Sequence, residues 1–179
     1  MKTAIVFLFV SVTAFAQQSE RFGNQRPPQI PLPSTCGPDA QSFNVSLDDA
    51  KHSLVLPQAG MAILHFVNDD GSGVGGATLG SPTTRYAVDG AWVGANHGES
   101  WFSVEVAPGE HHVCAALQSS FFQGVELAHF TAEAGKSYFF RTRLFAWQTT
   151  GLLEFAPIDS DEAGYLISLY PMATATAKK

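Results

Sequence analysis

The chain has 179 residues, a formal net charge of −6, 45% hydrophobic residues and 15% charged residues. This length fits one domain with tails and is enough to bury a hydrophobic core. The ten Lys and Arg residues are scattered among sixteen acidic ones. This balance argues against binding to nucleic acid or to anionic membrane surfaces.

The N-terminus has the features of a secretory signal peptide. Lys2 is followed by an apolar stretch over residues 4–15, which ends in the pattern Ala14-Phe15-Ala16. A charged start, a short hydrophobic region and small residues at the cut predict cleavage after Ala16. The apolar stretch is too short for an ordinary transmembrane helix. We therefore expect residues 1–16 to be a signal peptide and the mature chain to be periplasmic or extracellular, with no membrane span after cleavage.

A proline-rich arm follows over residues 17–42, with five prolines between Pro27 and Pro38. Prolines favour extended, polyproline-like backbone, so we expect a tether or a surface arm. The two cysteines of the chain are Cys36 in this arm and Cys114 in the predicted domain. In an exported chain they predict one disulfide, which would contribute about 4 kcal/mol by loop closure. The alternative is two independent buried thiols.

Short strands with turns between them are predicted over residues 43–158. Asp89-Gly90 suits a two-residue type I′ hairpin turn, and Pro108-Gly109 suits a type II turn. These turns lie within the run 84–116, which we expect to form four short strands. Residues 61–67 are a continuous apolar run, typical of a strand buried on both faces. Alternating apolar residues predict the remaining strands at 43–47, 125–131, 137–147 and 152–158.

This pattern is typical of a sandwich or a barrel, and we predict an all-β fold: a single antiparallel, Ig-like β-sandwich of about 7–9 strands over residues 43–170. Asp159, followed by acidic residues, suits the start of a short C-terminal helix that ends near Leu169. Residues 171–179 are predicted to be a disordered tail. The glycine-rich stretch 68–82 contains a G-x-G-x-x-G pattern, but the residues after it cannot form the helix that a dinucleotide site needs. We therefore predict a plain loop and no cofactor.

Several segments resemble an exported bacterial family, the "domain of unknown function 2846" group in its acidobacterial form. The resemblance extends over residues 62–168, with Cys36-Gly37-Pro38 also matching. It is carried by PTTRYAVDGAWVGANHGESWF, VAPGEHHVC, VELAHFTAEAGKSYFFRTRL and PIDSDEAGYLISLYP. Two turns, VAPGEHHV and EAGKSYFF, are also similar to PEGA modules and to other prealbumin-like sandwiches. The resemblance implies a β-sandwich and export, and it supplies no catalytic residues.

No catalytic or metal site is predicted from the histidines. His111 and His112 point to opposite faces of a strand, so they cannot both hold one ion without a bulge. His112 and Cys114 share a face, but a cysteine in a disulfide no longer offers an anionic ligand. The chain also lacks a nucleophile motif, and the acidic residues near Asp159 are explained by helix capping. We therefore expect a non-enzyme, with a metal-handling protein or a metal-assisted hydrolase as the weaker alternative.

Two sets of residues are candidates for an interaction surface. Phe121 and Phe122 lie between polar residues and are predicted to form an exposed loop tip, or else to fold back over one end of the sandwich. Arg141 and Arg143 could stack on an acidic or glycan ligand, or pair with acids on a neighbouring strand such as Glu126 or Glu154.

These features together predict a non-catalytic binding or adhesion module at the cell envelope. Its partner would be an envelope protein or a polysaccharide. The alternative is a structural protein that acts by forming oligomers, and the sequence leaves the oligomeric state open.

Overall fold

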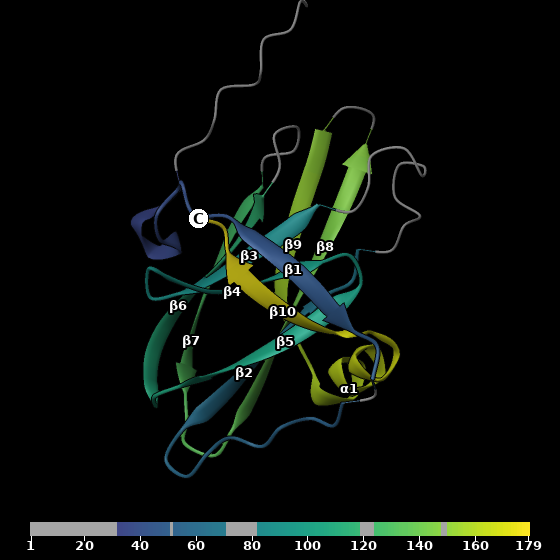
Figure 1. The fold of residues 1–179 in the computed structure, drawn as a ribbon. Coiled ribbons are helices and arrows are strands. Elements are labelled where there is room, and N and C mark those ends of the chain that lie inside the picture. The colour runs from purple at the N-terminus through teal and green to yellow at the C-terminus, as the bar shows by residue number, and fades with distance from the viewer. Residues whose placement is uncertain (1–31, 51, 71–81, 119–123, 148–149) are drawn as a thin grey trace, which may run out of the picture.

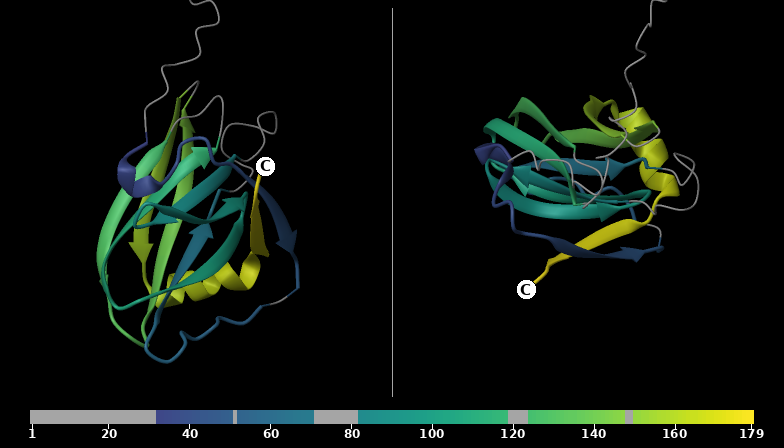
Figure 2. Two further views of the ribbon diagram at one scale, coloured as in Figure 1. Left: turned by 60° about the vertical axis from the view of Figure 1, so that its left-hand side comes forward. Right: turned by 90° about the horizontal axis from the view of Figure 1, so that it is seen from above.

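The computed structural model describes residues 32–50, 52–70, 82–118, 124–147 and 150–179. These residues form a two-layered β-sandwich with one α-helix (Figures 1 and 2). This confirms the predicted fold class. Its elements are a 3-10 turn Ser34–Cys36, β1 Phe43–Asp48, β2 Ala62–Asn68, β3 Thr83–Val88, β4 Ala91–His97, β5 Ser100–Val106, β6 Gly109–Gln118, β7 Val125–Ala132, β8 Ser137–Trp147, β9 Thr150–Ile158, α1 Ser160–Leu169 and β10 Met172–Ala177.

The first layer is a six-stranded sheet in the order β1-β10-β5-β2-β8-β9, and the second is a four-stranded sheet in the order β4-β3-β6-β7. Most neighbours are antiparallel, but β2–β8 and β10–β5 are parallel. Between β2 and β8 the chain crosses between the layers: β3 and β4 lie in the second sheet, β5 returns beside β2, and β6 and β7 complete the second sheet before β8 pairs with the other side of β2. The sheet therefore differs from the purely antiparallel one that local turn signals predict.

The core lies between the two layers and is centred on aromatic side chains. Phe66 lies 4.8 Å from Tyr86, 5.3 Å from Phe102 and 6.1 Å from Phe140, measured between ring centres. The ring of Phe102 fills the space beside Gly94, where a Cβ atom would come within 2.5 Å of that ring. Residue 94 must therefore lack a side chain for the two sheets to close on each other.

The run from β3 to β6 forms four strands, as the sequence predicts. Asp89 and Gly90 both have positive φ, at 50° and 82°, as a type I′ turn requires. Asp89 also holds the following hairpin, because its Oδ1 accepts a hydrogen bond of 2.9 Å from the backbone N–H of His112. The turn at this position thus connects β3 and β4 and also contacts β6.

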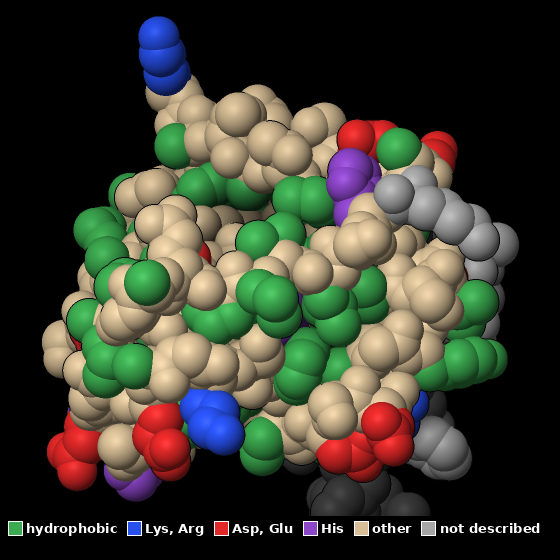
Figure 3. Space-filling model, turned by 90° about the horizontal axis from the view of Figure 1, so that it is seen from below, with side chains coloured by type: hydrophobic (Ala, Val, Ile, Leu, Met, Phe, Trp, Pro, Cys, Tyr) green, Lys and Arg blue, Asp and Glu red, His purple; other side chains and the backbone are tan. Residues whose placement is uncertain are grey.

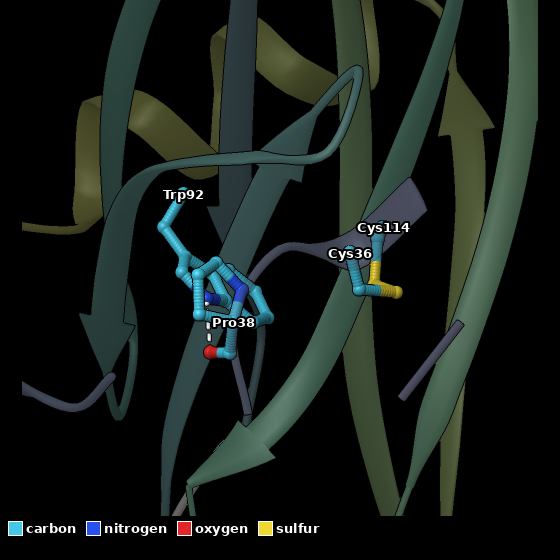
Figure 4. The surroundings of a disulfide bond; sticks show 4 residues. All are labelled: Cys36, Pro38, Trp92 and Cys114. Carbon is cyan, nitrogen blue, oxygen red and sulfur yellow. Dashed lines mark hydrogen bonds between the residues drawn. A yellow bond between two sulfur atoms is a disulfide. The ribbon is translucent and has the colours of Figure 1, made fainter. Parts of the chain in front are cut away.

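A disulfide joins Cys36 to Cys114, as predicted, and fastens the arm to the outer face of β6. Both cysteines are fully buried. Beside the disulfide, the indole N–H of Trp92 donates a hydrogen bond of 2.8 Å to the carbonyl of Pro38 (Figure 4). The guanidinium of Arg85 lies 4.5 Å from the centre of the Trp92 ring. The predicted signal peptide and the first part of the arm lie outside the described residues.

The C-terminal helix forms as predicted, and Asp159 caps it. One carboxylate oxygen of Asp159 accepts hydrogen bonds from the backbone N–H groups of Asp161, at 2.9 Å, and Glu162, at 2.8 Å. Within the described residues, no helix is long and apolar enough to cross a membrane.

The prediction of a disordered C-terminal tail is wrong, because Met172–Ala177 form β10. This strand pairs along its whole length with β1 and meets β5 at Met172 and Trp101. Ala173 is 3% exposed and packs into the main core. Small alternating residues carry little strand signal by themselves, so the pairing partner and the buried alanine decide the outcome.

Candidate functional site

The outer face of the six-stranded sheet is covered by α1. Ala163, Leu166 and Ile167 of the helix pack against Val67, Trp101 and Phe139 of the sheet. These three helical residues lie on one side of α1, at the spacing of an amphipathic helix. The opposite side of α1 leaves Tyr165 and Leu169 exposed, at 65% and 58% of their surface.

A second cover, which we call the strap, consists of residues 52–60 and has no regular secondary structure. His52 at its start packs edge-on against Trp101, with 6.5 Å between ring centres. Further along, the backbone N–H of Gln58 donates a hydrogen bond of 2.8 Å to the carboxylate of Glu105. Trp101 and Glu105 lie on β5, so the strap runs along this strand.

The sheet face contains a buried pair that sequence reasoning missed, His65 and Ser103. They lie opposite each other on β2 and β5, and 2.7 Å separates His65 Nδ1 from Ser103 Oγ. His65 is fully buried and stacks on Phe139 at 4.8 Å. Burial lowers the pKa of His65 to about 4, so its ring is neutral at physiological pH. Alternation along β5 places Ser103 on the face opposite Phe102 and Val104, but only strand pairing identifies its partner.

A Ser–His pair suggests a nucleophile and its base, but this pair is poorly suited to that role. A working base needs a pKa near the operating pH and a third group that orients its ring. The pKa of His65 lies well below that range. Its Nε2 is buried with no hydrogen-bond partner among the described residues. The pair therefore contributes to the packing of this sheet face, where the ring of His65 lies against those of Phe139 and Trp101.

A groove of about 460 Å³ separates the beginning of the strap from the end of α1. It is lined by Asp49, His52 and Ser53 on one side and by residues 167–171 on the other. The strap continues past the groove into three consecutive exposed apolar residues, Leu54, Val55 and Leu56, at 39%, 55% and 80% exposure. We use the name docking face for the exposed apolar residues of the strap and of α1, of which Leu169 lines the groove: Leu54, Val55, Leu56, Tyr165 and Leu169.

Hydrophobic side chains gather across the middle of the lower end of the molecule, and acidic side chains lie towards its rim (Figure 3). Scattered single apolar residues are normal on a protein surface, whereas a run of consecutive exposed apolar residues such as Leu54 to Leu56 is a candidate interaction surface. The apolar run Leu54-Val55-Leu56 is visible in the sequence of the strap. Its exposure could not be predicted, because an apolar run of this kind is equally typical of a buried strand.

The two arginines predicted as an interaction surface are both engaged in ion pairs. Arg141 pairs with Glu162 of α1. The Nε of Arg143 donates a hydrogen bond of 2.7 Å to Asp69, which follows β2. The predicted partners, Glu126 and Glu154, are therefore not the ones that the structure records. Glu126 lies on β7 in the other sheet, which the order of strands along the chain did not reveal.

The end of the core where β2 terminates is lined by polar side chains from both sheets. The hydroxyl groups of Tyr86 and Thr142 lie 2.6 Å apart, and Thr142 donates a hydrogen bond of 3.2 Å to Asn68. Asp70 accepts a hydrogen bond from the backbone N–H of Leu144. Asp70 is 5% exposed, and burial raises its pKa to about 6.

Within the described residues, several buried polar atoms at this end have no hydrogen-bond partner: Asn68 Nδ2, Asp70 Oδ2, Thr84 Oγ1 and Asn96 Oδ1. Buried polar groups of this kind are normally satisfied, and ordered water is the usual partner where protein groups are lacking. We call this region the polar end of the core. Apart from Asp70, which follows β2, its residues stand at inward positions of strands that look like ordinary core strands in the sequence.

The other predicted surface, Phe121 and Phe122, lies outside the described residues, as does the G-x-G-x-x-G pattern. Their exposure stays a prediction. Among the described residues, no group of three or more His, Cys, Asp or Glu side chains is arranged around a common metal position.

In comparisons with known proteins, no family model, no curated protein and no solved structure matches this chain. The resemblance to the domain of unknown function 2846 group therefore stays a prediction, and so does its implication of export. The buried disulfide is compatible with an oxidising compartment.

Proposed function

We propose that the chain is a non-catalytic binding module of the cell envelope, and that its docking face holds an apolar segment of an envelope protein. The observation that carries the proposal is the run Leu54-Val55-Leu56, which exposes three consecutive aliphatic side chains beside a groove. Water contact with aliphatic surface is unfavourable by roughly 25 cal/mol per Å², so a partner that covers this surface gains free energy from it.

The chemistry of the docking face favours a protein over a polysaccharide as the partner. Four of its five side chains are aliphatic, counting those of Leu54, Val55, Leu56 and Leu169. Aliphatic side chains offer no flat aromatic face and no hydrogen bonds to a sugar. Arg141 and Arg143, which could bind an acidic glycan, are already paired with Glu162 and Asp69.

The strap and α1 hold the docking face in a defined shape. The strap is attached by its hydrogen bond to Glu105 and by the contact of His52 with Trp101. The helix is attached by its buried residues and by the ion pair between Arg141 and Glu162. A preformed face lowers the ordering cost that a partner must offset on binding.

A photo-crosslinking amino acid at Val55 would test this proposal in the native envelope, with the same amino acid at Leu152 as the control. Leu152 is 66% exposed and lies on β9, away from the docking face. The proposal expects a protein crosslinked from position 55 and not from position 152. The crosslinked protein is then purified, and its affinity for the native chain is compared with that for Leu54→Ser/Leu56→Ser and for Leu152→Ser.

We expect the double variant to bind at least about tenfold more weakly, which corresponds to about 1.4 kcal/mol, and Leu152→Ser to bind like the native chain. Equal affinity of all three proteins would refute the docking face. A crosslink from position 55 to a second copy of the chain, with a dimer that Leu54→Ser/Leu56→Ser dissociates, would instead favour the oligomerising role.

A further inference from the structure

Two histidines face each other on the outer surface of the four-stranded sheet. His112 on β6 and His129 on β7 are directly opposite in the antiparallel register, so their side chains lie on the same face. Their ring centres are 5.8 Å apart and their planes are tilted by 36°. Both residues are exposed. The sequence did not reveal this pair, because His129 is seventeen positions away and the pairing of β6 with β7 brings it to His112.

The other four histidines all have polar partners. His65 is bonded to Ser103, and His111 is bonded to Asp89 at 2.6 Å. His52 and His97 interact with Asp48, at 3.1 Å, and with Thr83, at 3.3 Å. Within the described part of the chain, no hydrogen bond or ion pair engages the ring of His112 or His129. These two rings are therefore available to a ligand, and their neighbours do not hold them in other orientations.

The geometry points to a two-histidine site for a borderline divalent transition-metal ion such as Cu²⁺ or Zn²⁺; we propose that His112 and His129 bind such an ion together. Neutral imidazole is a preferred ligand of these metals. Nitrogens at about 2.0–2.1 Å from one ion place the two ring centres roughly 5 Å apart. The observed separation of 5.8 Å therefore needs only a small side-chain rotation at two exposed positions.

The surroundings favour a cation at this position. Glu110 is exposed and lies two residues before His112, so it shares the face of the histidine pair. The carboxylate of Asp89 accepts the backbone N–H of His112. Cys114 also shares the face but is in the disulfide, so its sulfur offers no thiolate ligand. Water completes the coordination of an ion held by two protein ligands.

A bound ion would connect β6 to β7, which is one of the two edge strands of its sheet. The metal stabilises the folded chain, because a ligand that binds the native state raises its stability in proportion to the logarithm of ligand concentration over Kd. The ion is expected to follow the usual order of affinities, with Cu²⁺ bound more tightly than Zn²⁺ and with Mg²⁺ and Ca²⁺ not bound at this site.

The test titrates the oxidised full-length chain, without a purification tag, with Cu²⁺ and with Zn²⁺, using calorimetry and the ring resonances of all six histidines in NMR spectra. We expect one equivalent of each metal to bind, and we expect Cu²⁺ to broaden the resonances of His112 and His129 before those of the others. His112→Ala and His129→Ala should each lose about tenfold or more in affinity. His97→Ala, which removes another exposed histidine, should leave affinity unchanged.

Circular dichroism of the variants checks that the sheet is retained, which is expected for exposed positions. A second measurement uses the native protein alone: Cu²⁺ and Zn²⁺ should each raise its melting temperature, and Mg²⁺ and Ca²⁺ should not. The proposal is overturned if the native chain shows no saturable metal binding. It is also overturned if His112→Ala and His129→Ala bind as tightly as the native chain.

Discussion

Replacing Asp70 with asparagine should stabilise the protein at neutral pH and leave it unchanged in acid. Burial raises the pKa of Asp70 to about 6 from its ordinary value of 3.8. The folded state therefore binds the proton more tightly than the unfolded state, and its stability falls as pH rises through this interval. At 1.36 kcal/mol per pKa unit, the charged carboxylate lowers the free energy of unfolding by up to about 3 kcal/mol above pH 7. The asparagine side chain of Asp70→Asn keeps an oxygen that can accept the N–H of Leu144 without this charge.

Protonation of His65 changes the stability in the opposite direction over nearly the same pH range. Burial lowers its pKa to about 4 from 6.5, so the unfolded state binds the proton more tightly. Its contribution to stability is present above pH 6.5 and is lost as pH falls towards 4, again by up to about 3 kcal/mol. The two slopes oppose each other in the native chain. Asp70→Asn therefore uncovers the rise of stability with pH that His65 causes.

Urea denaturation of the oxidised protein, followed by fluorescence between pH 3.5 and pH 8, measures both effects. The difference in free energy between Asp70→Asn and the native chain should be near zero at pH 3.5 and should grow to about 2–3 kcal/mol at pH 8. Taking this difference removes the contributions of the other titrating groups. His65→Gln should show a fall in stability between pH 4 and pH 6. A variant Asp70→Asn that is less stable than the native chain at pH 8, or whose difference does not change with pH, would refute the reasoning.

Three further predictions concern the parts that hold the fold together. The double variant Cys36→Ser/Cys114→Ser should lose about 4 kcal/mol of unfolding free energy, measured by urea denaturation, because the disulfide closes a separation of 78 residues. An unchanged urea midpoint would show that the arm is held without the disulfide. Asp159→Ala should lower the unfolding free energy by about 1 kcal/mol in the same assay, since two backbone N–H groups of α1 lose their acceptor. Asp161→Ala is the control and should have a smaller effect. Gly94→Ala should lower the melting temperature, because the new Cβ would lie 2.5 Å from the ring of Phe102. Gly164→Ala is the control and should not lower it, because a Cβ at that position meets no atom within 4 Å. Equal melting temperatures for the two variants would contradict this packing.

The local elements were predictable because they depend on neighbouring residues. The four strands of β3 to β6 and their type I′ turn follow from alternation and from the Asp-Gly pair. The N-cap of α1 follows from the acidic residues at its start. The disulfide followed from there being two cysteines in a chain with a predicted signal peptide.

The candidate sites were much less predictable, because each depends on residues far apart in the chain. The pairs His65–Ser103 and His112–His129 exist only once β2 lies beside β5 and β6 beside β7. The exposure of Leu54 to Leu56 depends on the strap lying over a sheet face that is already filled by Trp101, Phe139 and α1. Phe121 and Phe122 stay a predicted surface that mutation to alanine would test against the docking face.

The sequence by itself determined the fold class, the order and type of most elements, the helix cap and the disulfide, since each rests on a period, a turn or a composition within a short stretch. Only the tertiary structure decided the parallel pairing of β2 with β8, the ordering of β10 and the partners of Arg141 and Arg143. The physical reason is that strands pair through backbone groups that all residues share. The register and the neighbours of each strand are therefore selected by burial across the whole domain. Ala173 is an example, because it is buried in the core and lies on the C-terminal strand that pairs with the sheet.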